Sequence, residues 1–264
     1  MPMSKNFQTA DDIVCRLRAA DAEELAVLER TLAADTRKTV QKALASARKR
    51  NAAEQAEAER LAGMYAFQEH LAQGRLLVGL DEVGRGPLAG PLTVAGVVLP
   101  ANPRIAGLDD SKKLSPAARE SIAEQVKQVA IAWSIQHIEP AEIDEKGMSC
   151  CLRAAFTRAV RAIEDAGIEP EVVLLDGNPL GIDSREVNVV KGDGKCASIA
   201  AASIIAKVER DALMVKYAEQ YPGYGFESNK GYGAAEHIWA IRTLGLTPIH
   251  RAAFCTAFTQ QTLF

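Results

Sequence analysis

The chain has 264 residues, of which 48% are hydrophobic and 25% are charged, and its formal net charge is −3. This composition excludes a disordered or fibrous protein, and the charge excludes a nucleic-acid binder that is basic over its whole surface. No apolar run is long enough to cross a bilayer and no signal peptide is readable, so we expect a cytoplasmic protein with five reduced cysteines and no membrane partner.

The first 74 residues differ in composition from the rest of the chain. They hold 17 alanines but only two glycines and one proline, whereas residues 75–264 hold 17 glycines and 10 prolines. We therefore predict a helical N-terminal extension over 1–74 and a mixed α/β domain over 75–264. Thr9 and Asp21 each precede an acid by three residues and are expected to cap two helices. Asp35 is expected to begin a third helix that runs to about residue 62.

The third predicted helix carries two opposite stripes. On a helical wheel its apolar stripe is Val40, Leu44 and Ala47, and its basic stripe is Arg37, Lys38, Lys42, Arg48 and Lys49. The basic stripe suits contacts with nucleic-acid phosphates. A solvated helix face has the same pattern, and the 11 basic residues of 1–74 are balanced by 11 acidic residues.

Strands and helices then follow in an order typical of an α/β domain. We expect strands at 75–82, 92–99, 130–137, 171–175 and 186–190, and helices at 115–128, 148–166, 195–219 and 234–244. Two successive strands followed by alternating helices and strands predict a mixed sheet covered by helices. The small residues after 195 predict a helix that packs closely on the sheet. Lys207, Arg210 and Asp211 are expected to return to solvent, with a structural ion pair as the alternative.

Acidic residues stand where apolar strands end. Asp81 and Glu82 end the first strand of this domain, and Asp176 ends the fourth. Ligand sites in such sheets gather at these strand ends, where a carboxylate is costly unless it is paired or metal-bound. Glu82 faces away from Asp81 on a regular strand, so both serve one site only if the strand breaks there. Each acid alone is equally explained as a turn or cap residue.

Asp193, within VVKGDGK, either caps the next helix or is a fourth carboxylate. A group of carboxylates without paired histidine or cysteine ligands favours Mg²⁺ or Mn²⁺ over zinc, and two such ions can drive phosphodiester hydrolysis. The four histidines are far apart in the sequence and are expected to be surface or packing residues. Tyr221, Tyr224 and Tyr232 lie among glycines and either present a ring to a sugar or base or pack within a loop.

Six segments in this order resemble the type 2 ribonucleases H, and specifically bacterial ribonuclease HII. They are GLDEVGRGPLAGP at 79–91, DSKKLS at 110–115, LLDGN at 174–178, VVKGDGKCASIAAASIIAKVERD at 189–211, YPGYGFESNKGYG at 221–233 and TPIHR at 247–251. The resemblance spans about 75–255. It implies an RNase H-like fold with a mixed five-stranded sheet flanked by helices, preceded here by the helical extension.

The resemblance also implies an activity and a site. The activity is metal-dependent cleavage of RNA in RNA/DNA hybrids, and incision 5′ of single ribonucleotides in duplex DNA, leaving 3′-hydroxyl and 5′-phosphate ends. The catalytic and metal-binding residues, for two Mn²⁺ or Mg²⁺ ions, would be Asp81, Glu82, Asp176 and Asp193. The substrate-binding residues would be Gly84, Arg85, Gly86, Ser111, Lys112, Lys113 and Tyr232. Ala234, Ala252 and Ala253 depart from the family pattern, which bears on substrate contacts and not on the four acids.

Alternatives remain for the activity and the partners. Ribonuclease HIII has the same acids, but its larger N-terminal domain is expected to be rich in strands. A non-catalytic hybrid-binding protein and a Mg²⁺-dependent phosphatase of small molecules are further readings. The C-terminus carries a sliding-clamp-like pattern in Gln260, Leu263 and Phe264, or is a tail without that role. We expect a monomer.

Overall fold

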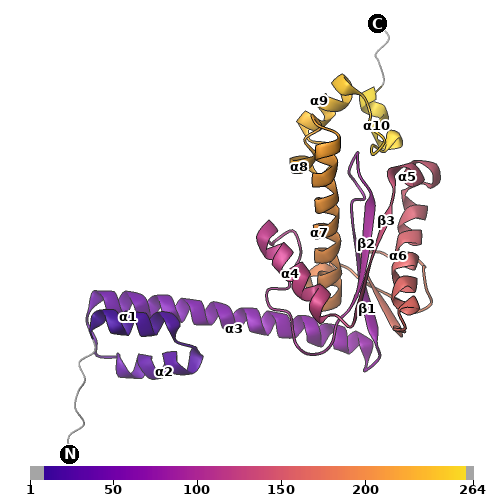
Figure 1. The fold of residues 1–264 in the computed structure, drawn as a ribbon. Helices are drawn as coiled ribbons and strands as arrows, with labels where there is room; N and C mark the ends of the chain where they lie inside the picture. Colours follow the sequence, from indigo (N-terminus) through magenta and orange to yellow (C-terminus); the bar gives the residue numbers. More distant parts are fainter. Residues whose placement is uncertain (1–8, 260–264) are drawn as a thin grey trace, which may run out of the picture. The chain divides into compact units, whose positions relative to one another are not determined.

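The computed structural model describes residues 9–259, which divide into two compact units (Figure 1). Unit 1 ends at Arg60 and unit 2 begins at Leu61. This division falls inside helix α3, which runs over Lys38–Ala72. The expected end of this helix near residue 62 is therefore wrong by about ten residues. No helix among residues 9–259 is long and apolar enough to cross a membrane.

Unit 1 is a small helical core made by α1 (Ala10–Ala19), α2 (Ala22–Thr31) and the first part of α3. Both predicted caps are confirmed. Thr9 accepts the backbone N–H of Asp12, whose carboxylate accepts the N–H of Thr9 in return, and Asp21 accepts the N–H of Glu24. The predicted apolar stripe is also confirmed, because it packs with residues of α1 and α2 in one cluster that includes Leu17, Leu28, Val40, Leu44 and Ala47.

Unit 2 is built on a five-stranded sheet with the order β3-β2-β1-β4-β5. The central strand β1 (Leu77–Val83) pairs antiparallel with β2 (Leu92–Val98) and parallel with β4 (Val172–Asp176). Outside these lie β3 (Ala132–Ile138), antiparallel to β2, and β5 (Glu186–Val189), parallel to β4. The predicted mixed sheet is thus confirmed, and β1 and β4 end at the same edge.

Helices cover both faces of this sheet (Figure 1). One face packs in a core cluster with α7 (Ala197–Gln220) and α4 (Pro116–Val129), and the other with α6 (Met148–Asp165). The alanine-rich α7 packs closely, as predicted: a Cβ added at Gly79 of β1 would lie 2.4 Å from the backbone carbon of Ser198. Only glycine allows this approach of helix to strand.

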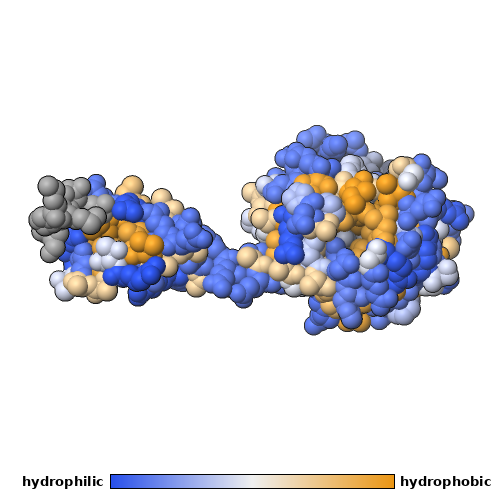
Figure 2. All heavy atoms as spheres, turned by 90° about the horizontal axis from the view of Figure 1, so that it is seen from below, coloured by the Kyte–Doolittle hydropathy of each residue, from blue (hydrophilic) through white to orange (hydrophobic). Residues whose placement is uncertain are grey.

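The remaining elements lie between and after these. They are α5 (Pro140–Lys146), the 3₁₀ turn η1 (Gly192–Gly194), α8 (Phe226–Asn229), α9 (Ala235–Leu244) and α10 (Ala252–Thr259). Of these, only α9 was expected from the sequence. Hydrophilic side chains cover most of both units in the view of Figure 2, where hydrophobic residues gather in a few areas.

The last turns of α3 belong to unit 2. Leu61, Met64 and Tyr65 are buried in the same core cluster as α7 and α4. The Oε1 atom of Gln68 accepts the N–H of Ser198, at 2.9 Å, in the first turn of α7. The cap residue of α7, Cys196, makes no capping bond with its own side chain. Gln68 therefore satisfies an N–H group that the helix itself leaves without an intrahelical partner.

Candidate active site

Asp81 and Glu82 lie within β1, close to its end. The strand stays regular through both residues, with Asp81 opposite Ala95, Glu82 opposite Val94 and pairing on to Val83. The expectation that both serve one site only if the strand breaks is therefore wrong, because the charge of Glu82 still acts on Asp81 and is itself affected by Asp176. Asp81 is 7% exposed, and its Oδ1 accepts the N–H of Glu82 at 2.7 Å. Glu82 pairs with Arg85, with 3.2 Å between Oε1 and Nη1. The two carboxyls repel each other even though the strand stays regular.

Asp176 and Asp193 are joined by the backbone between them. Oδ1 of Asp176, at the end of β4, accepts the N–H of Gly192 at 2.6 Å. That bond fixes η1, which contains Asp193, beside the carboxyl end of β4. Asp193 is buried and does not cap α7, so the capping alternative is excluded for this residue. The structure thus brings the four acids named from the sequence to one edge of the sheet.

Electrostatic coupling shows how near these acids are to one another. Burial raises the pKa of Asp81 well above its ordinary value, and the charges of Glu82 and Asp176 raise it further. Burial also raises the pKa of Glu82, with Asp176 adding to the effect and Arg85 opposing it. The pKa of Asp193 is raised by burial and by the charges of Asp110 and Asp176. Crowded carboxyls with raised pKa values, here Asp81, Glu82 and Asp193, are a common property of functional sites.

The nearby cations compensate this charge only in part. Lys112 lies 3.6 Å from Asp193 and is 80% exposed, so this pair is weak and open to exchange. Lys113 is also exposed and pairs with Asp109 instead. Arg85 holds Glu82 from an exposed position. Asp81, the most buried acid of the four, has no ion pair among residues 9–259.

The donor set fits a hard divalent cation. All candidate ligands are carboxylate oxygens, which Mg²⁺ and Mn²⁺ prefer, and a bound cation would relieve the repulsion that raises the pKa values of Asp81 and Asp193. In the part of the chain that the structure describes, no three acidic, histidine or cysteine side chains already form a closed ligand group. The fit therefore rests on donor chemistry and charge, not on preformed coordination.

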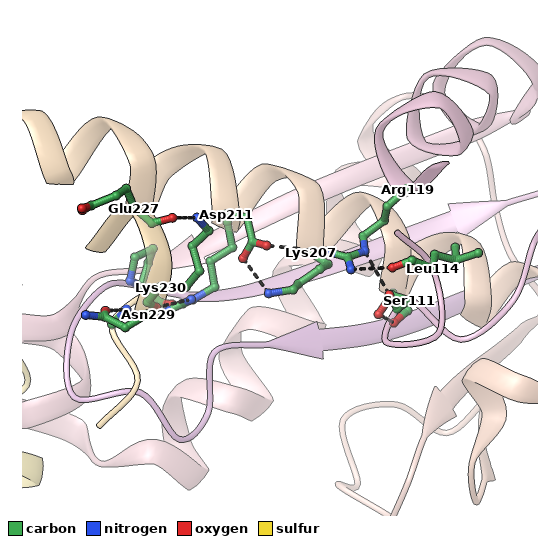
Figure 3. Close-up of polar contacts among 12 residues, drawn as sticks. Ser111, Leu114, Arg119, Lys207, Asp211, Glu227, Asn229 and Lys230 are labelled. Atoms are coloured by element: carbon green, nitrogen blue, oxygen red, sulfur yellow. Dashed lines mark hydrogen bonds and ion pairs between the residues drawn. The ribbon is translucent and has the colours of Figure 1, made fainter. Parts of the chain in front are cut away.

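The loop with Ser111 is fastened behind the acids. Ser111 is buried, and its hydroxyl lies 3.0 Å from that of Ser203 on α7, which in turn hydrogen-bonds to Asp81. Figure 3 shows Arg119 of α4 reaching the carbonyl oxygens of Ser111 and Leu114, which fixes this loop. Ser111 thus contacts the acids through Ser203, whereas Lys112 and Lys113 face solvent.

The ion-pair alternative on α7 is confirmed for Lys207 and Asp211, and the predicted return to solvent is wrong for Arg210. Lys207 and Asp211 form an ion pair of 2.7 Å at the half-buried side of the helix, where Arg119 also lies 3.7 Å from Asp211 (Figure 3). Arg210 is completely buried. It is inside because its guanidinium hydrogen-bonds to backbone carbonyls of a loop more than a hundred residues earlier, which no local pattern reveals.

The glycines of the 84–86 turn have different roles. Gly84 has φ +92°, and an added Cβ would lie 2.4 Å from Nε of Arg210 and 2.7 Å from the carbonyl oxygen of Pro91. Gly86 has nothing within 4 Å of that position, so its surroundings are open. Gly84 is required by the protein's own packing, and Gly86 leaves room for an incoming molecule.

The three tyrosines separate into packing and exposed residues. Tyr224 is buried and its hydroxyl donates to the carbonyl oxygen of Gly245, and Tyr221 packs in the same cluster. Tyr232 is 43% exposed, with the guanidinium carbon of Arg210 5.8 Å from the centre of its ring. Only Tyr232 of the three keeps a ring free enough to meet a ligand.

Two histidines, far apart in the sequence, meet in the interior. Nε2 of His237 lies 3.1 Å from Nε2 of His250, and Nδ1 of His237 lies 2.8 Å from the carbonyl oxygen of Tyr232. Their packing role is confirmed, but the pair itself was not expected. The sequence gives no spacing signal for it, because the two residues come from different segments, α9 and the turn before α10.

The four acids lie apart from the cavity of unit 2. A cavity of about 420 Å³ in unit 2 is lined by Leu76 and Leu77, at the opposite end of β1. None of the four acids lines it. An acidic site flanked by Arg85, Lys112 and Lys113 suits a phosphate-bearing substrate held by metal ions.

Comparison with known proteins matches most of the chain to one family. Residues 78–257 match the family Ribonuclease HII, and residues 9–72 match the Ribonuclease HII N-terminal domain. The chain is 42% identical to Ribonuclease HII of Bacillus subtilis over 253 residues, which are 94% of this chain and 97% of the relative.

Solved structures share the fold of unit 2. The PCNA:RNase HII complex from Archaeoglobus fulgidus is similar with a TM-score of 0.60 at 27% identity, covering 71% of this chain and 98% of that one. Bst-RNase HIII in complex with Mn²⁺ has a TM-score of 0.53 at 22% identity, covering 70% of this chain and 68% of that one, and shows the fold alone. The predicted RNase H-like architecture is confirmed. The chain belongs to the ribonuclease HII family and is a ribonuclease H, an endoribonuclease that produces 5′-phosphomonoesters.

Proposed function

We propose that this ribonuclease H cleaves the RNA strand of RNA/DNA hybrids with divalent metal ions, and that it also incises 5′ of single ribonucleotides in duplex DNA. The observation that carries the proposal is the convergence of Asp81, Glu82, Asp176 and Asp193 at one edge of the sheet, where burial and neighbouring carboxylates raise the pKa values of Asp81, Glu82 and Asp193. In a cell these reactions serve ribonucleotide and primer removal.

Asp81, Glu82, Asp176 and Asp193 would hold two Mg²⁺ or Mn²⁺ ions. When bound, the ions supply an activated water and stabilise the leaving 3′-oxygen of the cleaved strand. The choice of metal rests on the carboxylate donor set, which suits hard divalent cations. Ser203 and Ser111, hydrogen-bonded in series behind Asp81, fix the orientation of its carboxyl.

The substrate would meet residues on both sides of the acids. The N–H groups of the Gly84-Arg85-Gly86 turn suit a ribose 2′-hydroxyl, which distinguishes RNA from DNA. The half-exposed ring of Tyr232 suits the apolar face of a sugar. Lys112 and Lys113 suit backbone phosphates, so binding should weaken as salt rises.

Cleavage of two substrates tests this proposal. We would compare a DNA duplex with one ribonucleotide and a long RNA/DNA hybrid, with Mg²⁺, Mn²⁺ or EDTA, and with Asp81→Asn as the inactive variant. Metal-dependent cutting 5′ of the ribonucleotide is the expected result. Cutting of the long hybrid alone would favour an HIII-like specificity, and binding without cutting would favour a non-catalytic role. Turnover of a chromogenic phosphoester without either cut would favour a phosphatase.

Unit 1 is proposed to assist hybrid binding through its basic stripe. Arg37 and Arg48 are engaged with Asp35 and Glu29, which reduces what they can offer to a phosphate. Lys38, Lys42 and Lys49 are exposed and form no ion pair within residues 9–259. Replacing these three lysines with glutamine should weaken hybrid binding and flatten its salt dependence, and unchanged binding would show a merely solvated face.

A clamp partner is proposed for the C-terminal tail. Gln260, Leu263 and Phe264 lie outside the described residues, and support comes from the PCNA complex of the Archaeoglobus fulgidus relative. Deleting residues 260–264 should abolish clamp binding by the otherwise monomeric protein and leave cleavage intact.

All five cysteines are free thiols, which accords with a cytoplasmic location.

A further inference from the structure

Arg251 is a fully buried cation that holds the loop of residues 84–91. Its Nη2 donates to the carbonyl oxygen of Gly84 at 2.6 Å and to that of Gly90 at 2.8 Å. Its Nη1 donates to the carbonyl oxygen of Arg85 at 3.1 Å, and its Nε donates to that of Gly90 at 3.1 Å. One guanidinium therefore fixes both ends of this loop.

Arg210 of α7 holds the same loop from a second side. Its Nε donates to the carbonyl oxygen of Pro91 at 2.9 Å, and its Nη2 donates to that of Ala89 at 3.1 Å. Its Nη1 donates to the carbonyl oxygen of Lys230 at 2.9 Å, two residues before Tyr232. The buried arginine pair, Arg210 and Arg251, thus ties the 84–91 loop to α7 and to the segment that carries Tyr232.

The hydrogen-bond partners of these two buried charges are all backbone carbonyls, and each guanidinium also lies over an aromatic ring. Neither guanidinium forms an ion pair with a carboxylate within residues 9–259, and both side chains have an exposed fraction of 0%. Burial, together with the charge of Arg210, lowers the pKa of Arg251 to about 10, so the residue stays charged at neutral pH. Burying two cations in this way is expensive, and it leaves a positive potential beneath the loop.

The bonds to Arg251 also determine which way the peptide groups of the turn face. In a planar trans peptide, the C=O of one residue and the N–H of the next point in opposite directions. The carbonyls of Gly84 and Arg85 point inward to Arg251, so the N–H groups of Arg85 and Gly86 point away from it. Neither N–H donates to another group among residues 9–259. Successive outward N–H groups form an acceptor-binding concavity.

We propose that Arg251, supported by Arg210, is a positioning residue that holds the 84–86 turn with its N–H donors facing a substrate hydroxyl or phosphate oxygen. The inference rests on the proposed function, in which this turn recognises the ribonucleotide. It assigns the orientation of the turn to two side chains that lie behind the site and do not touch the substrate. Gly86, open on its outer side, marks where the oxygen would enter.

Equilibrium binding of the full chain in EDTA tests this without cleavage. The probes are a DNA duplex with one ribonucleotide and the same duplex without it, followed by fluorescence anisotropy. Arg251→Lys keeps the charge but cannot hold three carbonyls in one plane. We expect it to reduce the preference for the ribonucleotide about fivefold to tenfold, as for the loss of one or two hydrogen bonds, while affinity for the all-DNA duplex changes less than about twofold.

The matched control is Arg185→Lys. Arg185 also combines a carbonyl partner, Pro170, with several hydrogen bonds, but it pairs with Glu164 and Asp183 away from the four acids. Arg185→Lys should lower the thermal stability and leave the preference for the ribonucleotide duplex unchanged. An equal loss of preference in both variants, or none in Arg251→Lys, would overturn the inference.

A measurement on the wild type covers the case in which Arg251→Lys does not fold. Hydrogen exchange of a peptide that contains residues 82–88 should show unprotected amides at Arg85 and Gly86 in the free protein, and protection with the ribonucleotide duplex. Absence of added protection there would refute the inference. If the wild type neither prefers nor cuts the ribonucleotide duplex, the proposed function itself fails, which is a separate result.

Discussion

His250 donates a hydrogen bond to His237 across 3.1 Å, and the direction of this bond is fixed by its neighbours. Nδ1 of His250 accepts the N–H of Thr247 at 2.9 Å, so its proton must be on Nε2. Nδ1 of His237 faces the carbonyl oxygen of Tyr232 at 2.8 Å, so it carries the proton and Nε2 accepts. A directed chain of neutral imidazoles therefore ends at the backbone of Tyr232.

Acid should break this chain. Burial and the neighbouring His237 lower the pKa of His250 to about 4, whereas the unfolded chain takes up this proton near pH 6.5. The stability that neutral His250 confers is thus complete above pH 6.5 and is lost as pH falls through about 4, by up to about 3 kcal/mol. Denaturant unfolding between pH 7 and pH 4 measures this loss.

Two substitutions test whether His250 is responsible for the loss of stability between pH 7 and pH 4. His250→Gln should remove most of the pH dependence in this window, at the expense of lower stability at pH 7. His70 is exposed on α3, and His70→Gln should leave the profile as it is. A steep profile that persists in His250→Gln would assign the effect to other groups.

Asp81→Asn should stabilise the metal-free protein. The pKa of Asp81 is raised well above 3.8 by burial and by Glu82, so its charge at neutral pH destabilises the folded state. The amide removes this charge, so the melting temperature in EDTA should rise by a few degrees at pH 7, and the gain should shrink toward pH 4. A lower melting temperature at pH 7 would contradict the raised pKa.

The same variant should respond differently to metal. Mn²⁺ or Mg²⁺ should raise the melting temperature of the wild type, because a ligand that binds only the folded state stabilises it. The rise should be much smaller in Asp81→Asn, which lacks one of the anionic ligands. Equal shifts in both proteins would show that Asp81 does not hold the ion.

Alanine at Gly84 and at Gly86 should have opposite consequences. At Gly84 the new Cβ combines φ +92° with contacts of 2.4 Å to Arg210 and 2.7 Å to Pro91, so the fold should lose about 2–4 kcal/mol. Gly86→Ala meets no protein atom within 4 Å and should unfold like the wild type. Its methyl group should instead weaken binding of the ribonucleotide duplex. Similar stability of the two variants would show that the 84–91 loop shifts to accommodate a Cβ at residue 84 at little cost in free energy.

Truncation should separate the two parts of α3. A chain that begins at residue 61 keeps Leu61, Met64, Tyr65 and Gln68 and should fold as a nuclease. A chain that begins at residue 75 loses these core contacts and the bond to Ser198, and it should melt at a clearly lower temperature. Gln68→Ala alone should cost about 1–2 kcal/mol. Equal melting of the two truncated chains would contradict this division.

Local patterns in the sequence predicted most of the elements because those patterns have local causes. Apolar runs with β-branched residues made the strands, and Thr9 and Asp21 accept N–H groups at helix starts as expected. The end of α3 was missed because Gly63 resembles a terminator. The helix continues past it since Met64 and Tyr65 are buried in the core of unit 2, and tertiary packing outweighs a small propensity cost.

The site was less accessible to sequence than the fold. The acids stand at strand ends, which the sheet brings together by topology, and this could be anticipated. Arg210, Arg251 and the His237–His250 pair depend on partners far away in the sequence, up to 167 residues for Arg251. The two arginines donate to backbone carbonyls, which leave no mark on composition or periodicity. Only the segment resemblance pointed to those regions.

The contact of Gly79 with the backbone of Ser198 determines which parts of the enzyme can adapt to a substrate. A Cβ at Gly79 would lie only 2.4 Å from the backbone of Ser198, so no side chain stands between β1 and α7 at this point. Without such side chains to re-pack, the helix cannot slide along the strand. Asp81, Glu82 and Ser203 therefore move as one rigid block. Accommodation of hybrids of different width or curvature falls to the surface loops, and mutations that tune substrate range should accumulate there while the strand and its helix stay unchanged.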